Sequence, residues 1–125
     1  MNIERSIDIE DAVRLALADH MNAYCRPLPK DYRLPCILVS KVGGTDRDKI
    51  DTFEVVLDSR ANTEYEADLT LRNAIGILKA GEYPTPIRYV TVNSSGSWGS
   101  DPVRPDLAMC SARLRIVAHI EHATI

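Results

Sequence analysis

The chain has 125 residues, the usual size of one domain, and its 45% hydrophobic and 26% charged residues are ordinary for a soluble globular protein. Its formal net charge of −3 is too small to indicate a membrane surface, and the negative sign argues against a general nucleic-acid binder. We therefore expect one domain that spans residues 1–125.

The first predicted element is an amphipathic helix. Apolar residues recur at helical spacing over residues 8–23, and Asp8 is placed to cap the helix N-terminus. Three prolines then fall within residues 26–35. They exclude a helix in this segment, so we expect an extended connector.

A β-hairpin is predicted next. Residues 36–42 form an apolar strand that ends at the glycine pair 43–44, and residues 45–49 form a polar loop. Residues 50–58 form the second strand, because apolar residues alternate there with mostly polar ones, among which we place Asp51. The apolar face of this strand consists of Phe53, Val55 and Leu57.

The second helix is predicted from the residues at its two ends. Thr63 and Glu66 fit a capping box, in which the threonine side chain caps the helix and the glutamate reaches back. Gly81 is placed to end the helix after Ala80. The buried stripe consists of Ala67, Leu71, Ala74, Ile75 and Leu78.

Two strands are predicted in the C-terminal part. Residues 87–93 form a short strand, and the Gly- and Ser-rich residues 94–102 form a long flexible loop. Residues 107–121 alternate between apolar and polar side chains, which is typical of a half-buried antiparallel strand. The element order is then α-β-β-α-β-β. We expect an α+β fold with two helices packed on one face of a four-stranded, mainly antiparallel sheet.

Patterns that carry catalytic or metal chemistry have ordinary structural explanations. His119 and His122 point to opposite faces of a strand, and the acidic residues between positions 46 and 58 lack the glycine and closing glutamate of a calcium loop. The three cysteines show no CxxC spacing and no neighbouring histidine, so we expect core thiols in a reducing cytosol. We predict no catalytic, cofactor-binding or metal-binding residue, and no cofactor.

Exposed loops and one strand face supply candidate interaction residues. Trp98, the only tryptophan, lies in the Gly/Ser loop, where it either packs over the core or contacts a partner. Arg113 and Arg115 on the polar face of the last strand either face a partner or are ordinary surface charges. The candidate assembly interface consists of Arg47, Asp48, Lys49, Trp98, Asp101, Arg104, Arg113 and Arg115.

The pattern along nearly the whole chain resembles the tail terminators of long-tailed bacteriophages, also called tail-completion or minor tail proteins. An amphipathic helix precedes a proline-rich stretch at residues 26–29, and a strand ends in a Gly-Gly turn at residues 38–44. An alanine-rich helix follows at residues 64–79. A Gly/Trp/Pro-bearing loop at residues 98–102 and a long final strand at residues 108–120 complete the resemblance.

The resemblance implies a non-enzymatic structural protein of the virion. Such subunits form a ring, commonly hexameric, that caps the head-proximal end of the tail tube, stops its polymerisation and provides the docking face for the head. The implied partners are the major tail tube protein and a head-completion protein. DNA passes through the lumen without specific binding, no membrane is involved, and assembly takes place in the host cytoplasm.

Two alternatives stay open at this point. One is a head–tail connector, or head-completion protein, of the phage neck. The other is a small oligomeric α+β enzyme or ligand-binding domain, whose pocket of convergent polar groups would include His20, His119 or Cys110.

Overall fold

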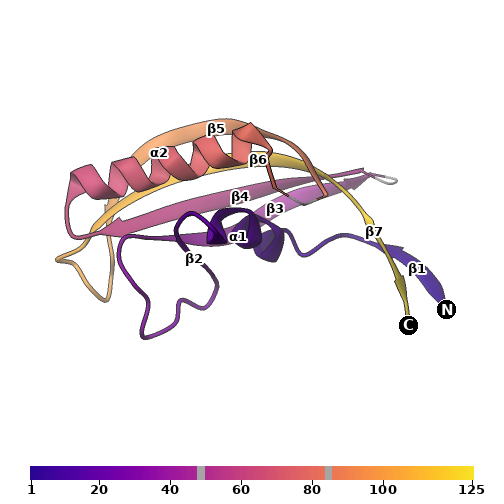
Figure 1. Ribbon diagram of the computed structural model, residues 1–125, viewed down its shortest axis with the longest axis horizontal. Helices are drawn as coiled ribbons and strands as arrows, with labels where there is room; N and C mark the ends of the chain where they lie inside the picture. The colour runs from indigo at the N-terminus through magenta and orange to yellow at the C-terminus, as the bar shows by residue number, and fades with distance from the viewer. Residues whose placement is uncertain (48–49, 84–85) are drawn as a thin grey trace.

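The computed structural model describes residues 1–47, 50–83 and 86–125, and within them it contains two helices and seven strands (Figure 1). In chain order these elements are β1 (Asn2–Arg5), α1 (Ile9–Ala18), β2 (Asn22–Cys25), β3 (Cys36–Arg47), β4 (Ile50–Ala61), α2 (Glu64–Ala80), β5 (Ile87–Ser100), β6 (Ala108–His119) and β7 (Glu121–Thr124).

The strands form two separate sheets. The main sheet has five strands in the order β2-β3-β4-β6-β5, in which β2 is parallel to β3 and the other neighbours are antiparallel. Consequently β4 and β5 run in the same direction with β6 between them, and α2 makes the crossover from one to the other. β1 and β7 form an antiparallel two-stranded ribbon that extends away from the main sheet (Figure 1).

Both helices begin at the side-chain caps that the sequence predicts. The Asp8 carboxylate accepts a hydrogen bond from the backbone N–H of Asp11, and the Thr63 hydroxyl accepts one from the backbone N–H of Glu66, each at 3.2 Å. Helix α2 ends at Gly81, whose φ of 70° lies in the left-handed region that glycine adopts without steric cost. Local chemistry therefore fixes three of the four helix ends.

Helices α1 and α2 pack on the same face of the main sheet and share one hydrophobic core with it. The predicted alternation is confirmed, because the apolar residues on this face between Phe53 and Leu57 of β4 and between Cys110 and Ala118 of β6 are at most 3% exposed. These residues are Phe53, Val55 and Leu57 on β4, and Cys110, Ala112, Leu114, Ile116 and Ala118 on β6. Burial of one such large side chain stabilises the fold by about 1.5–3 kcal/mol, so this layer is the main source of stability. Neither helix packs on the opposite face, which is called the bare face below.

The expected four-stranded sheet is wrong, and β2 is the first reason. Helical spacing suggested that the first helix continues to residue 23, but α1 ends at Ala18 and the chain turns. Residues Asn22–Cys25 instead pair in parallel with the start of β3, and the Asn22 side chain donates hydrogen bonds to the carbonyls of Arg33 and Pro35 at 3.4 and 3.1 Å. A short apolar run fits a helix end or a strand equally well, so the tertiary pairing decides between them.

The terminal ribbon is the second difference. The expected last strand covers residues 107–121, but β6 ends at His119 and residues 121–124 pair with β1. Asn2 lies opposite Thr124 and Arg5 lies opposite Glu121 in this ribbon. β1 and β7 are more than a hundred residues apart in the sequence, so their pairing leaves no local signal.

Two glycine-containing segments expected to be loops are strands. β3 continues through the glycine pair to Arg47, with a register shift between Lys41 and Gly43. A Cβ atom on Gly44 would lie 2.6 Å from the carbonyl oxygen of Thr52, so glycine is needed there for close strand pairing and not for a turn. β5 likewise continues through residues 94–100, with three register shifts against β6.

Candidate assembly surfaces

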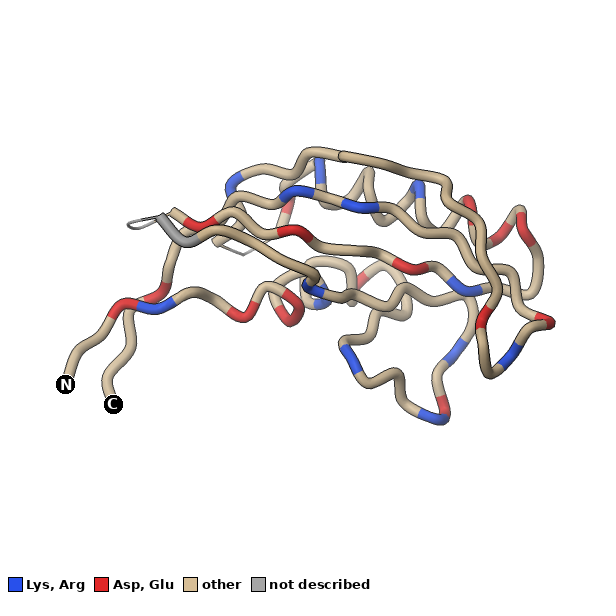
Figure 2. The backbone as a smooth tube through the Cα atoms, turned by 180° about the vertical axis from the view of Figure 1, so that it is seen from behind, with Lys and Arg blue, Asp and Glu red and all other residues tan. Residues whose placement is uncertain are grey.

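The bare face of the main sheet carries a polar network. Arg115 on β6 pairs with Glu54 on β4, with 3.3 Å between Nε and Oε1, and Asn93 on β5 donates a hydrogen bond to the other carboxylate oxygen at 3.1 Å. Arg113 is also exposed, two residues before Arg115 on the same face. Figure 2 shows basic and acidic positions interspersed along the strands and not gathered on one side. A hydrated face of mixed charge suits contact with a polar protein surface better than contact with a polyanion.

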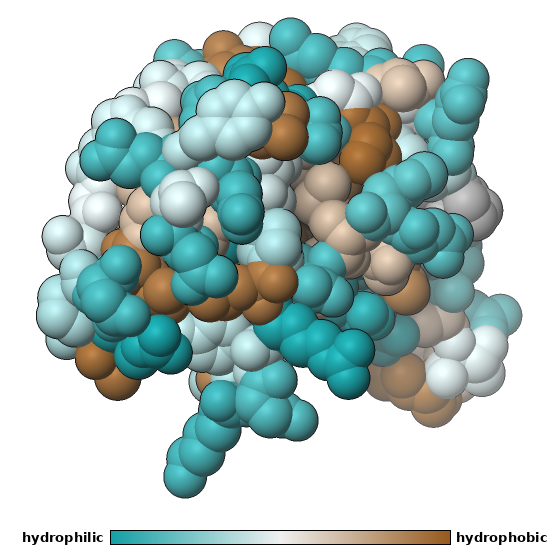
Figure 3. All heavy atoms as spheres, turned by 60° about the vertical axis from the view of Figure 1, so that its left-hand side comes forward, coloured by the Kyte–Doolittle hydropathy of each residue, from teal (hydrophilic) through white to brown (hydrophobic). Residues whose placement is uncertain are grey.

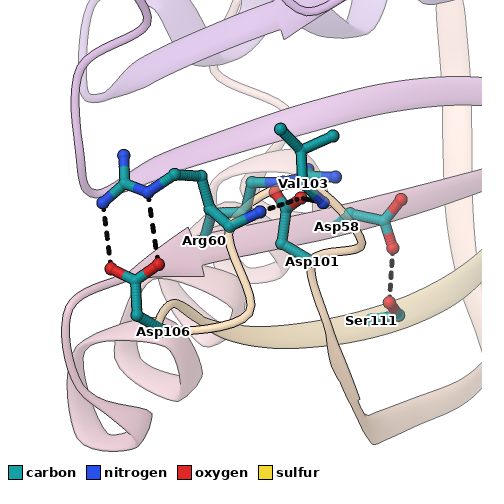
Figure 4. A network of polar contacts seen from close by, with 7 residues as sticks. Asp58, Arg60, Asp101, Val103, Asp106 and Ser111 are labelled. Carbon is teal, nitrogen blue, oxygen red and sulfur yellow. Dashed lines mark hydrogen bonds and ion pairs between the residues drawn. The ribbon is translucent and has the colours of Figure 1, made fainter.

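Asp101 is buried, although the sequence suggested an exposed position in a flexible loop. Its Oδ2 atom accepts a hydrogen bond from Nε of Arg60 at 2.9 Å, and both side chains are at most 10% exposed. Its Oδ1 atom accepts hydrogen bonds from the backbone N–H groups of Val103 and Arg104 at 2.9 and 3.1 Å. Figure 4 shows this carboxylate between the β4 arginine and the turn that follows β5. Asp101 therefore fastens that turn to the sheet.

The protonation state of Asp101 favours this contact. Burial by itself raises the pKa of the Asp101 carboxyl, but the hydrogen bonds from Arg60 and from the two backbone N–H groups outweigh burial and hold the pKa below its ordinary value. The carboxylate is consequently charged at neutral pH. Within the described part of the chain, Nη1 of Arg60 is buried without a hydrogen-bond partner, so Asp101 is the group that compensates this cation.

Two other predicted interface residues near this turn are exposed. Arg104 pairs with Asp106 on the solvent side of the turn at 3.0 Å, and both side chains are at least half exposed. Trp98 lies on β5 opposite Cys110 of β6 and is 51% exposed. The exposed part of the tryptophan is large enough to contact another chain.

β5 is an open edge of the main sheet. Within residues 1–47, 50–83 and 86–125 it pairs with β6 alone. Residues 89–100 of this strand include no charged side chain. Charged side chains are a common device that protects edge strands from pairing with other chains, and here only the three register shifts provide such protection. This edge is therefore suited to the addition of a strand from another chain.

A cleft of about 320 Å³ lies between the start of β4 and the segment that leads into α1. It is lined by Ser6, Lys41, Gly44, Asp51 and Phe53 among others. The expected placement of Asp51 on the polar face is wrong: it shares the core face with Phe53 and is 1% exposed. Neither carboxylate oxygen has a hydrogen-bond partner among the described residues, and the Lys41 ammonium lies over the Phe53 ring at 5.3 Å. A buried carboxylate without a partner is destabilising.

The candidate residues Cys110 and His119 do not share a site, whereas His20 lines a cleft between the end of α1 and the first half of α2. Burial raises the pKa of the Cys36 thiol to about 11 and also raises the pKa values of Cys25 and Cys110, so these thiols are protonated and weakly nucleophilic at neutral pH. His119 lies nine residues from Cys110 on β6, and it faces outward where Cys110 faces the core. Within the described residues no group of three or more His, Cys, Asp or Glu side chains could hold a metal ion.

The remaining predicted residues are Arg47, Asp48 and Lys49. Arg47 is the last residue of β3 and pairs with Ile50. Asp48 and Lys49 lie outside the described residues. The structure thus brings Arg113 and Arg115 together on the bare face, and it groups Asp101 with Arg104 around one turn. Sequence reasoning missed Glu54 and Asn93, whose contact with Arg115 depends on strand order, and it missed the open edge of β5.

Comparison with known proteins leaves the chain without an assigned family. No protein-family model matches the chain, and no curated protein matches it either. No helix among the described residues is both long enough and apolar enough to cross a membrane. The surfaces described above are therefore the basis for a functional proposal.

Proposed function

We propose that this protein is a non-enzymatic structural subunit of a long-tailed bacteriophage. In this proposal it forms a ring that caps the head-proximal end of the tail tube, stops tube polymerisation and provides the docking face for the head. The observation that supports the proposal is the open edge of β5, uncharged over residues 89–100, beside a sheet face that neither helix covers. A subunit that works by assembly needs such adhesive surfaces.

The two edges of the main sheet offer surfaces for a head-to-tail contact between copies. One edge is β5, which is 14 residues long, and the other is the four-residue β2 followed by the outer part of β3. Because the two edges differ in length and sequence, a contact between the β5 edge of one copy and the β2–β3 edge of the next would join unlike patches. Such heterologous contacts generate a closed ring when the rotation between copies completes a circle.

The bare face supplies a second kind of contact. Its Arg115–Glu54 pair and the neighbouring Arg113 offer hydrogen bonds in a mixed-charge setting. In the assembled ring, we assign this face to contacts with the tail tube protein or the head-completion protein. DNA then passes through the lumen without specific recognition, in keeping with the net charge of −3.

The proposal is tested on the full chain. Size-exclusion chromatography with light scattering measures the mass in solution, and negative-stain images show whether the particles are rings. The protein is then mixed with purified tail tubes of the phage that carries the gene, and gold-labelled protein is located on the tubes. We expect rings, alone or on mixing, and label at one tube end. A chain that stays monomeric and leaves tube ends unlabelled would refute the proposal, and binding to the portal side instead would place the subunit in the neck.

A charge placed on the open edge gives a sharper comparison. Ser97→Lys puts a cation in the uncharged part of β5, and Asp31→Lys puts one in the exposed connector between β2 and β3. We expect the first variant to lose ring formation and the second to retain it. Both variants must unfold at the same urea concentration as the parent chain for the comparison to hold. Equal ring formation by the two variants would contradict a role for the β5 edge.

A further inference from the structure

The terminal ribbon formed by β1 and β7 has one apolar and one polar face. Side chains alternate across a strand, so residues that pair across the ribbon share a face. On one face lie Met1, Ile3, Ala123 and Ile125, followed toward the body by the Arg5–Glu121 ion pair at 2.8 Å. On the other face lie Asn2, Glu4, His122 and Thr124. Such alternation is typical of a sheet that is buried on one side.

The end of this apolar face is exposed, and Ile3 and Ala123 in its middle are half-buried. Met1 and Ile125 are 81% and 71% exposed, and the ribbon strands make their extensive contacts with each other. In Figure 1 the ribbon extends from the side of the molecule opposite to the start of α2. An isolated two-stranded ribbon is at best marginally stable in water, so a partner that buries its apolar face would stabilise it.

A cleft near the other end of the molecule has complementary chemistry. It has a volume of about 600 Å³ and lies between the end of α1 and the first half of α2. Met21, Pro35 and Leu69 form its apolar part, and Asn22, Glu66 and Asn73 are polar residues that line it. Figure 3 brings the side of the molecule where α2 begins toward the viewer and shows hydrophobic residues gathered between hydrophilic ones.

We propose that the ribbon is an arm whose apolar face docks in the α1–α2 cleft of a second copy of this chain. This inference rests on the proposed ring and identifies a contact that joins its subunits. Arm and cleft lie toward opposite ends of one molecule, so each copy can give an arm to one neighbour and receive an arm from the other. That head-to-tail contact is heterologous and is compatible with a closed ring.

The area that two ribbons could bury is too small for the simplest alternative contact, in which the ribbons of two copies pack only against each other. Five residues at about 3.4 Å each and two strands about 4.8 Å apart give each ribbon a face of roughly 170 Å². Two such faces together bury a few hundred Å² at most, whereas stable interfaces bury about 1,200–2,000 Å². The arm must therefore belong to a larger contact that includes the body of the neighbouring copy.

Matched substitutions on the two faces of the ribbon test this contact. Ile3→Asp with Ala123→Asp places two charges on one cross-strand pair of the apolar face. Asn2→Asp with Thr124→Asp places the same charges on the adjacent pair of the polar face. We expect the first variant to lower the ring fraction at least tenfold at a fixed protein concentration, and the second to leave it nearly unchanged. Rings that form equally well from both variants would overturn the arm proposal.

Disulfide cross-linking between two copies tests whether the ribbon contacts the α1–α2 cleft. In a Cys25→Ser background, which leaves only buried cysteines, one chain carries Ile3→Cys and another carries Leu69→Cys. We expect an oxidised covalent dimer from the mixture and little from either chain alone. A dimer formed by Ile3→Cys alone would place ribbon on ribbon and overturn the cleft assignment, as would a mixture without any cross-link.

The outcomes separate this inference from the proposed function. A parent chain that neither forms rings nor binds tube ends overturns both. Rings of the Ile3→Asp and Ala123→Asp variant that bind tube ends normally overturn the arm alone. Normal rings of that variant that lose tube-end binding would show that the apolar face meets the tube protein and not a second copy.

Discussion

Replacement of Asp101 by alanine is expected to destabilise the fold strongly. The substitution leaves the buried Arg60 guanidinium without its ion-pair partner and removes the acceptor for the N–H groups of Val103 and Arg104. Removal of one partner of a buried ion pair costs about 3–5 kcal/mol. A domain of this size has a total stability of about 5–15 kcal/mol, so this loss is a large fraction of the whole. The expected fall in Tm is on the order of 10 °C or more.

Urea unfolding followed by far-ultraviolet circular dichroism measures the effect. Asp106→Ala is the matched control, because its carboxylate pairs with Arg104 on the solvent side of the same turn, and we expect little change from it. A double-mutant cycle with Arg60→Ala isolates the coupling, since Asp101→Ala should cost much less once the arginine is gone. If Asp101→Ala is as stable as Asp106→Ala, the structural role assigned to this ion pair is wrong.

The Arg60–Asp101 ion pair also predicts that the contribution of Asp101 to folding stability is lost at acid pH. The pKa of Asp101 is lower in the folded chain than its ordinary value, so its contribution to stability is present above the unfolded pKa of about 3.9 and is lost as the pH falls through the folded pKa. The difference in unfolding free energy between the parent chain and Asp101→Asn should therefore be constant from pH 7 to about pH 5 and shrink below about pH 4. A difference that does not change at acid pH would contradict the ionised state of this carboxylate.

Four further substitutions, one of them a control, test the core and one helix end, and each is measured by urea unfolding. Asp51→Val removes a buried carboxylate that has no hydrogen-bond partner among the described residues, and it should stabilise the fold by about 1–3 kcal/mol; a loss of stability would mean that the carboxylate is compensated. Leu114→Ala should cost about 2–5 kcal/mol because the side chain is fully buried, while Leu15→Ala, at a position 56% exposed, should cost far less. Thr63→Ala removes the N-cap of α2 and should cost about 1 kcal/mol, an effect that would be absent if the cap contributed nothing.

Those parts of the fold that depend on neighbouring residues were predictable from the sequence. The caps at Asp8 and Thr63, the end of α2 at Gly81 and the inward faces of β4 and β6 all follow from local spacing. The alternation along β4 also predicts the position of Asp51, because this residue lies two positions before Phe53 and therefore shares its face. We expected Asp51 on the polar face because its side chain is acidic, but the alternation predicts its position on the core face correctly.

The parts that depend on distant pairing were not predictable. β2 and the terminal ribbon exist because of partners elsewhere in the chain, and residues 94–100 form a strand only because β6 provides the ladder beside them. The burial of Asp101 follows from Arg60, which is 41 residues away. Among the candidate interface residues, Arg104 and the two arginines of β6 are exposed, and a polar context predicts exposure without knowledge of a partner. For Trp98 the sequence left packing over the core and exposure open, and the side chain is 51% exposed.

The strand order has a consequence for how the chain folds during synthesis. β6 lies between β4 and β5, yet it is made after both. A ribosome that has released only the first hundred residues has therefore exposed the apolar side chains of β4 with one edge of that strand unpaired. Non-local strand pairing is slow, and unpaired apolar edges promote aggregation. We expect β5 and β6 to join the sheet together as a hairpin, and expression at low temperature or with a chaperone to raise the yield of the native chain.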